Sequence, residues 1–156
     1  MKLPITIKVN GETWPLDVAA NDVLLDVLRS KVGAKGAKIG CERGDCGTCT
    51  VLLDGHSIRS CLMLAIEADG HEITTVEGIP DNGVLSNLQN LFIKHNSFQC
   101  GFCAPGIVLG AHELLRDNPN PTRHDVQHAL AGNLCRCTGY EPIIDAVLAA
   151  AGEGQS

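Results

Sequence analysis

The chain has 156 residues, eight of them cysteine, and a formal net charge of −6 at pH 7. This length allows one domain or two small ones, and an acidic chain without a cluster of Lys or Arg is not expected to bind nucleic acid through its phosphates. Its apolar runs are too short for a membrane span, and the N-terminal residues lack the apolar stretch of a secretory signal. We therefore expect a cytoplasmic protein, in which so many cysteines are more typical of metal ligation than of disulfides.

The beginning of the chain predicts a β-hairpin followed by a helix. Residues 5–9 alternate apolar and polar side chains, Asn10-Gly11 is a strong two-residue turn signal, and residues 12–18 continue as a second strand. A helix capped by Asn21 or Asp22 is expected next, because apolar side chains then recur at helical spacing.

Three further strands are expected over residues 50–53, 56–60 and 71–76. Asp54-Gly55 joins the first two as a tight turn. Together with the hairpin, these strands predict a small mixed sheet with a helix across it.

The hydrophobic period changes after residues 78–81, and the second half of the chain is expected to be helical. Amphipathic helices are predicted at residues 84–95, 104–115, 122–131 and from residue 138 onward. The last two open on capping boxes, Thr122 with Asp125 and Thr138 with Glu141. This pattern predicts an all-α four-helix bundle.

Four cysteines lie close together in the stretch from residue 40 to residue 61. The first three follow the C-x4-C-x2-C spacing of a plant-type [2Fe–2S] site, with a more distant fourth ligand. Nearby glycines suit a loop that must reach positive φ and bring backbone N–H groups close to sulfur. A structural zinc site is the alternative, although it usually uses two close pairs. The four cysteines are Cys41, Cys46, Cys49 and Cys61.

A second set of four cysteines lies in the helical half, as Cys100-Gly-Phe-Cys103 and Cys135-Arg-Cys137. Each pair is expected just before a helix, where free N–H groups and the helix dipole favour an anionic cluster. This spacing is less specific, so zinc remains an alternative. A thioredoxin-type redox pair at the first two cysteines would leave the other two unused. A Rieske centre is rejected because no His is spaced as its ligands require.

The segments GCERGDCGTC, QCGFCAPG and GNLCRCTGY together resemble, along almost the whole chain, the iron–sulfur subunit of the xanthine oxidase family of molybdenum hydroxylases. The resemblance implies an α+β fold, with an N-terminal ferredoxin-like β-grasp domain in residues 1–77 and an all-α four-helix domain in residues 78–156. It also implies two [2Fe–2S] clusters. The cluster nearer the flavin is assigned to Cys41, Cys46, Cys49 and Cys61, and the one nearer molybdenum to Cys100, Cys103, Cys135 and Cys137.

The resemblance further implies an electron-transfer role. In the family, a separate large subunit holds molybdopterin and oxidises the substrate, and electrons then pass through both clusters to FAD on a third chain or to another acceptor. The family's Gln before the C-x2-C pair and its last Cys touch the pterin, which implies this contact for Gln99 and Cys137. The competing hypotheses are a free two-cluster ferredoxin and a zinc-stapled interaction module. No G-x-G-x-x-G motif opens a helix after a strand, so no nucleotide site is predicted on this chain.

Overall fold

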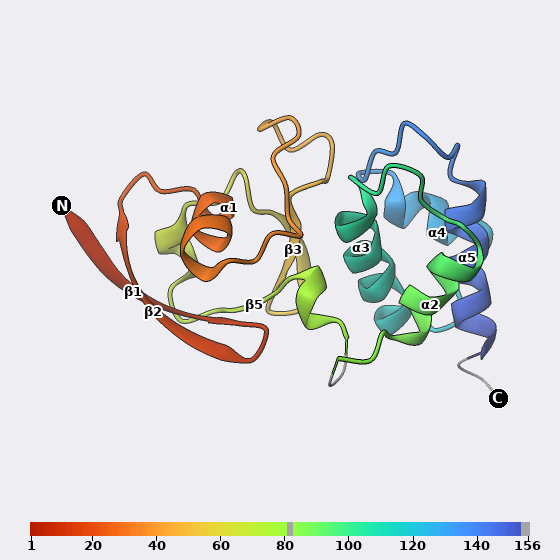
Figure 1. Cartoon of the computed structure of the whole chain (residues 1–156), viewed down its shortest axis with the longest axis horizontal. Helices are drawn as coiled ribbons and strands as arrows, with labels where there is room; N and C mark the ends of the chain where they lie inside the picture. Colours follow the sequence, from red (N-terminus) through yellow and green to blue (C-terminus); the bar gives the residue numbers. More distant parts are fainter. Residues whose placement is uncertain (81–82, 154–156) are drawn as a thin grey trace.

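The computed structural model describes residues 1–80 and 83–153, in which a mixed sheet with a covering helix lies beside a bundle of helices (Figure 1). This is the predicted α+β fold. The sheet has the strand order β2-β1-β5-β3-β4, with β1 and β5 parallel and the other neighbours antiparallel. Its strands are β1 Lys2–Val9, β2 Glu12–Ala19, β3 Thr50–Leu53, β4 His56–Arg59 and β5 Glu72–Thr74.

The N-terminal hairpin forms as its sequence predicts. Asn10 and Gly11 have φ of 50° and 86°, the left-handed values that a two-residue turn between twisted strands requires. The last strand is shorter than predicted, because β5 occupies the range Glu72–Thr74 and the chain then enters a 3₁₀ turn, η3, at Val76–Gly78.

One helix covers the sheet, and its start differs from the prediction. Helix α1, Leu24–Val27, continues as a wider π-type turn, η1, over Leu28–Val32, and both bury leucines in the sheet's core. Val23 occupies the N-cap position without a side-chain hydrogen bond, while Asp22 accepts a hydrogen bond from the Ala19 N–H (2.9 Å). The predicted cap was therefore wrong. The Leu24 N–H instead donates to the Met63 carbonyl (2.8 Å), so a later segment of the same chain partly replaces a side-chain cap.

The second half contains the four predicted helices. They surround a separate apolar core to which each contributes. The helices are α2 Asn87–Lys94, α3 Ala104–Asp117, α4 Arg123–Leu130 and α5 Glu141–Glu153. Within the two described ranges, no helix is long and apolar enough to cross a membrane.

Two of these helices begin later than predicted. Helix α2 is capped by Ser86, which leaves Val84 and Leu85 outside the helix and 68% and 41% exposed. Helix α5 begins at Glu141, and the Thr138 hydroxyl accepts a hydrogen bond from Tyr140 N–H (3.2 Å), so the predicted Thr138 capping box was wrong. The box that opens α4 is confirmed.

Helix α3 joins the two halves by packing against β3 and β4. Its glycine at position 106 lies against the first cysteine loop, where a Cβ atom would come within 2.4 Å of the Gly47 carbonyl oxygen. One turn further on, a Cβ atom at Gly110 would meet its nearest neighbour, the Leu130 side chain, at 3.4 Å. The two glycines of one helix therefore differ sharply in the room around them.

We expect Gly106→Ala to destabilise the protein by about 1 to 3 kcal/mol, because the added methyl must push a backbone carbonyl away. Gly110→Ala is the matched control, expected to be neutral or to stabilise by up to about 1 kcal/mol, because alanine is the better helix former. Thermal or urea unfolding of variants matched for iron content measures both. Equal stability of the two variants would contradict the close contact at Gly106.

Candidate metal centres

The first cysteine loop curls around the Cys41 sulfur. Positive φ at Glu42 (54°) and Gly44 (84°) turns the backbone so that the N–H groups of Arg43 and Cys46 both donate to Cys41 Sγ, at 3.4 Å each. The hydrogen bond from the Cys46 N–H, followed by that from Arg43, lowers the pKa of the Cys41 thiol to about 7. The loop thus favours a thiolate, which is the form that binds a metal.

Glycine is required in this loop by close contacts as well as by φ. A Cβ atom on Gly40 would lie 2.5 Å from Thr48 Oγ1 and 2.7 Å from Cys46 Sγ. The Thr48 hydroxyl itself contacts Cys46 Sγ at 3.2 Å. The loop therefore has room for the sulfur atoms and their hydrogen-bond partners but not for additional side chains.

The β3–β4 hairpin brings the distant fourth cysteine back to the loop. Cys49 precedes β3 and Cys61 follows β4 by two residues, and their sulfur atoms lie 3.3 Å apart. Burial, followed by the contact with Cys49, raises the pKa of the Cys61 thiol to about 11. This pair forms the more buried side of the first site.

The second set of cysteines gathers at the start of α3 and in the loop before α5. Cys103 directly precedes α3, and burial followed by its hydrogen bond with Cys135 raises its pKa to about 12. The Cys135 N–H donates to the Tyr140 hydroxyl (2.8 Å), which in turn donates to the Asn133 carbonyl (3.1 Å). The Thr138 hydroxyl lies 3.2 Å from Cys135 Sγ. These contacts fix the loop in which the later pair lies.

The remaining two cysteines form an exposed edge. Cys100 and Cys137 are exposed, and their sulfur atoms lie 3.6 Å apart. The Gln99 side-chain amide donates to the Cys137 carbonyl (3.1 Å). A hydrogen bond from the Phe102 N–H lowers the pKa of Cys100. The structure thus places together Gln99 and Cys137, the two residues for which a pterin contact is predicted.

The cysteines fit [2Fe–2S] clusters better than single zinc ions. All eight are free thiols, and their sulfurs approach one another in pairs. Two pairs per site suit two irons with two thiolates each, whereas zinc needs four ligands around one centre. The thioredoxin-type pairing of Cys100 with Cys103 also gains no support, since Cys100 approaches Cys137.

Sequence reasoning missed two threonines that touch the sulfurs. Thr48 and Thr138 each place a hydroxyl 3.2 Å from a cysteine Sγ. Their position in short, glycine-flanked stretches between or beside ligand cysteines was the available signal. Because hydrogen bonds to sulfur tune the potential of a cluster, these hydroxyls belong to the sites.

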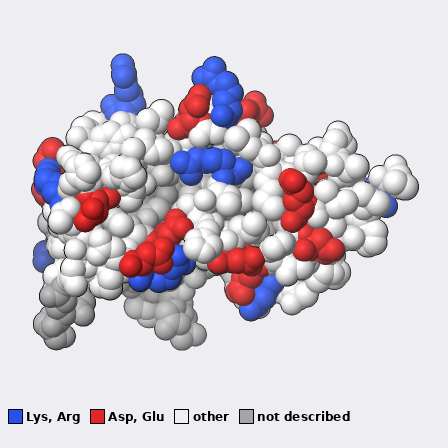
Figure 2. Space-filling view, turned by 180° about the vertical axis from the view of Figure 1, so that it is seen from behind, with Lys and Arg blue, Asp and Glu red and all other residues white. Residues whose placement is uncertain are grey.

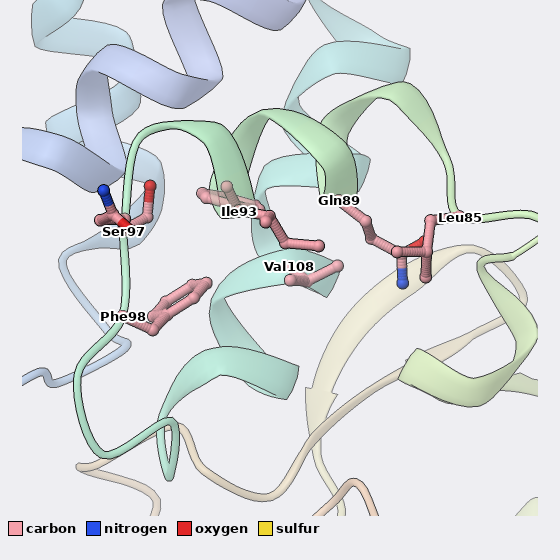
Figure 3. Close-up of a pocket in the computed structure, with 8 residues that line it drawn as sticks. Leu85, Gln89, Ile93, Ser97, Phe98 and Val108 are labelled. Carbon is pink, nitrogen blue, oxygen red and sulfur yellow. The ribbon is translucent and has the colours of Figure 1, made fainter.

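A separate hollow of about 400 Å³ lies on the helical half, beside α2 (Figure 3). Leu85, Gln89 and Ile93 line it from one side, with Phe98 and Val108 opposite. The described residues that line it include no cysteine and no titratable side chain, so it offers no groups for acid–base or redox chemistry.

The face of the molecule shown in Figure 2 carries no large basic patch. On the face shown in Figure 2, basic side chains lie singly or beside acidic ones, with wide uncharged areas between them. This arrangement agrees with the acidic composition.

Comparisons with known proteins agree with this geometry. The family model described as the 2Fe-2S iron-sulfur cluster binding domain matches residues 7–75, and the [2Fe-2S] binding domain matches residues 75–148. The small subunit of nicotine 6-hydroxylase from Paenarthrobacter nicotinovorans is 49% identical over 152 residues, covering 97% of this chain and 92% of that protein. The small FeS subunit of nicotinate dehydrogenase from Eubacterium barkeri is 44% identical over 146 residues, covering 94% and 93%.

This chain is a small iron–sulfur subunit of the molybdenum hydroxylase family. Two solved structures of the family agree in fold. Quinoline 2-oxidoreductase from Pseudomonas putida 86 superposes with a TM-score of 0.92 at 46% identity, covering 99% of both chains. Aldehyde oxidoreductase from Desulfovibrio gigas also gives a TM-score of 0.92, at 43% identity, but the match covers 99% of this chain and 18% of that one.

Membership of the small iron–sulfur subunits confirms several predictions. The chain has two [2Fe–2S] binding domains and is an electron-transfer subunit of a multi-subunit oxidoreductase. This family membership disfavours both competing hypotheses, a zinc-stapled interaction module and a free two-cluster ferredoxin.

The Thr138 hydroxyl provides a test of how the second site is tuned. Thr138→Val removes the donor beside Cys135 Sγ, so the extra charge of the reduced cluster loses a hydrogen bond and the reduction potential should fall. Thr138→Ser keeps the hydroxyl and should stay near the wild type. A redox titration followed by electron paramagnetic resonance measures both. Equal potentials in the two variants would show that the hydroxyl does not act on the cluster.

Proposed function

We propose that this chain carries electrons from a molybdopterin-bound molybdenum site on a large partner subunit to FAD on a third subunit, or to another acceptor. The observation that carries this proposal is the pairing of the eight cysteines into two sites within one chain, the second of which has a buried and an exposed side. When bound, each cluster would accept and release one electron at a time.

We assign the cysteines to two clusters according to the two groups of sulfur atoms. The proposed division between the two domains lies between residues 77 and 78. The cluster nearer the flavin is proposed on the sheet domain, and the cluster nearer molybdenum on the helical domain. Free N–H groups at the start of α3 and in the loop around Cys41 would offset the negative charge. The proposed ligands are Cys41, Cys46, Cys49 and Cys61 for the first cluster, and Cys100, Cys103, Cys135 and Cys137 for the second.

Exposure supports the proposed direction of electron flow. Cys100 and Cys137 lie at the surface, and the hydrogen bond from Gln99 holds the Cys137 carbonyl in place. A pterin on a partner could therefore reach Cys137 without rearrangement of this chain. At the other site, the loop residues Glu42, Arg43 and Asp45 are exposed, which leaves a second surface for the acceptor.

The proposed partners are a large molybdopterin-binding subunit and a flavin-binding subunit, in a cytoplasmic complex. The relatives named as small subunits have nearly the length matched here, which supports a separate large chain. Because the proposed molybdopterin site lies on the large subunit, we expect that partner to select the substrate.

A sizing experiment on native extract distinguishes this proposal from a free electron shuttle. We expect the chain to elute with a much larger, molybdenum-containing species and to lose its physiological activity when separated from it. A fully active chain that migrates alone at its mass of 16.5 kDa would contradict the proposed assembly.

Substitution of one cysteine in each group tests the two independent clusters. In the reduced protein, Cys41→Ser should remove one of two paramagnetic signals and Cys137→Ser the other, because each removes a thiolate from a different group. Iron content should fall in both. Loss of the same signal in both variants would be incompatible with the assignment.

A further inference from the structure

One arginine connects the two cysteine loops. Arg59 ends β4, two residues before Cys61, and its guanidinium donates to acceptors on both sides of the domain boundary. Its Nη1 donates to Thr50 Oγ1 (2.7 Å) and its Nε to the Gly44 carbonyl of the first loop (3.4 Å). Its Nη2 donates to the Gly132 carbonyl, three residues before Cys135 (2.7 Å).

These three acceptors are uncharged, as are the two carbonyl acceptors of Arg29, and this distinguishes Arg59 from three other arginines of the chain. Arg43, Arg116 and Arg123 each lie within 4.0 Å of an Asp or Glu carboxylate, whereas in the described ranges Arg59 has no such partner. Glu113 and Asp117 line the same cavity of about 460 Å³ as Arg59, but each is engaged elsewhere, with Ser57 and Arg116 respectively. The positive charge of Arg59 is therefore held by dipoles and is not cancelled by a contact ion pair.

The surrounding contacts leave Arg59 little freedom to move. The buried Asn133 amide donates to the Gly47 carbonyl and to Thr50 Oγ1, at 3.2 Å each. The Leu134 N–H donates to the Cys46 carbonyl (2.9 Å). These bonds fix the backbone on either side of the guanidinium, so its position relative to both groups of cysteines is fixed as well.

We propose that Arg59 is a positioning residue that holds the two cluster loops together and whose charge raises the reduction potentials of both clusters. The inference rests on the proposed ligand assignment. An oxidised cluster with four thiolates on a core of charge +2 carries −2, and reduction adds another negative charge. A partly buried cation that bridges the loops stabilises each reduced form, and burial weakens the screening by salt. It also eases the repulsion that an electron on one cluster exerts on the next.

The test uses the assembled complex with three variants. Arg59→Gln removes the positive charge. Arg59→Lys keeps the charge but lacks the planar guanidinium that donates to several acceptors at once. Arg116→Gln is the matched control. Arg116 also spans the boundary, by donating to the Gly55 carbonyl (2.6 Å), but it is paired with Asp117. Redox titration followed by electron paramagnetic resonance gives both cluster potentials, and the splitting between the signals of the fully reduced protein reports the distance between the clusters.

We expect Arg59→Gln to lower both potentials, so that at a fixed applied potential the ratio of reduced to oxidised cluster falls by roughly threefold or more. Arg59→Lys should keep both potentials near the wild type, and Arg116→Gln should leave them unchanged. Both Arg59 variants should alter the splitting between the clusters, because the bonds that join the loops are lost.

Wild-type potentials in Arg59→Gln would overturn the electrostatic role, and an unchanged splitting in both Arg59 variants would overturn the positioning role. If Arg59→Gln does not assemble, Arg59→Lys decides: an altered splitting with both potentials near the wild type supports the proposal, and an unchanged splitting refutes it. Failure of the ligand assignment gives a different result, because the wild-type protein itself would then lack two paramagnetic signals. Failure of the proposed function would appear as a fully active chain that migrates alone, whatever the potentials of the Arg59 variants.

Discussion

The structure depends on the direct contact of the two cysteine loops, backbone against backbone. A Cβ atom on Gly47 would lie 2.4 Å from the Gly132 carbonyl oxygen, and one on Gly106 would lie 2.4 Å from the Gly47 carbonyl oxygen. Glycine at these positions lets the loops approach more closely than side chains would allow. The Leu134 N–H then bonds to the Cys46 carbonyl, so the residue before Cys135 is tied directly to a cysteine of the other group. Electron transfer between two carriers requires that they lie close together. Here glycine residues at the contact allow the two cysteine loops to approach closely.

Burial divides the second site into a protected and an accessible side, whereas in the first site Cys49 is buried and the other three cysteines are half-buried. Cys49 and Cys103 are 2% and 9% exposed, while Cys100 and Cys137 lie at the surface. Burial raises the pKa of Cys103 and so opposes a free thiolate, which means that a bound cluster must supply the free energy to keep that sulfur charged. At exposed Cys100, a hydrogen bond from the Phe102 N–H instead lowers the pKa and favours the thiolate. The buried side thus suits retention of the cluster, and the exposed side suits electron exchange with a partner.

The sequence predicted best those features that depend on interactions between residues close together in the chain. The Asn10-Gly11 turn and the Thr122 capping box each depend on residues a few positions apart, and both form as predicted. The predicted caps at Asp22 and Thr138 fail because these side chains find other partners, and Thr138 instead contacts Cys135. Cysteine spacing indicated the sites, but Arg59 could not be found from spacing, since its bond to Gly132 joins residues 73 positions apart. Contacts made across the domain boundary are determined by packing of the whole chain, which no local pattern records.

The two halves keep separate apolar cores, so their relative orientation rests on the polar contacts between them and on the packing of α3 against β3 and β4. Net hydrogen bonds contribute only about 0.5 to 1.5 kcal/mol each, which makes this boundary modest in strength. Hydrogen bonds are directional, however, and those made by Arg59, Asn133 and Leu134 define one geometry. A boundary built this way specifies the separation of the two sites more than it strengthens the fold. For an electron-transfer subunit the separation is the functional quantity, and docking onto partner subunits can supply the additional stability.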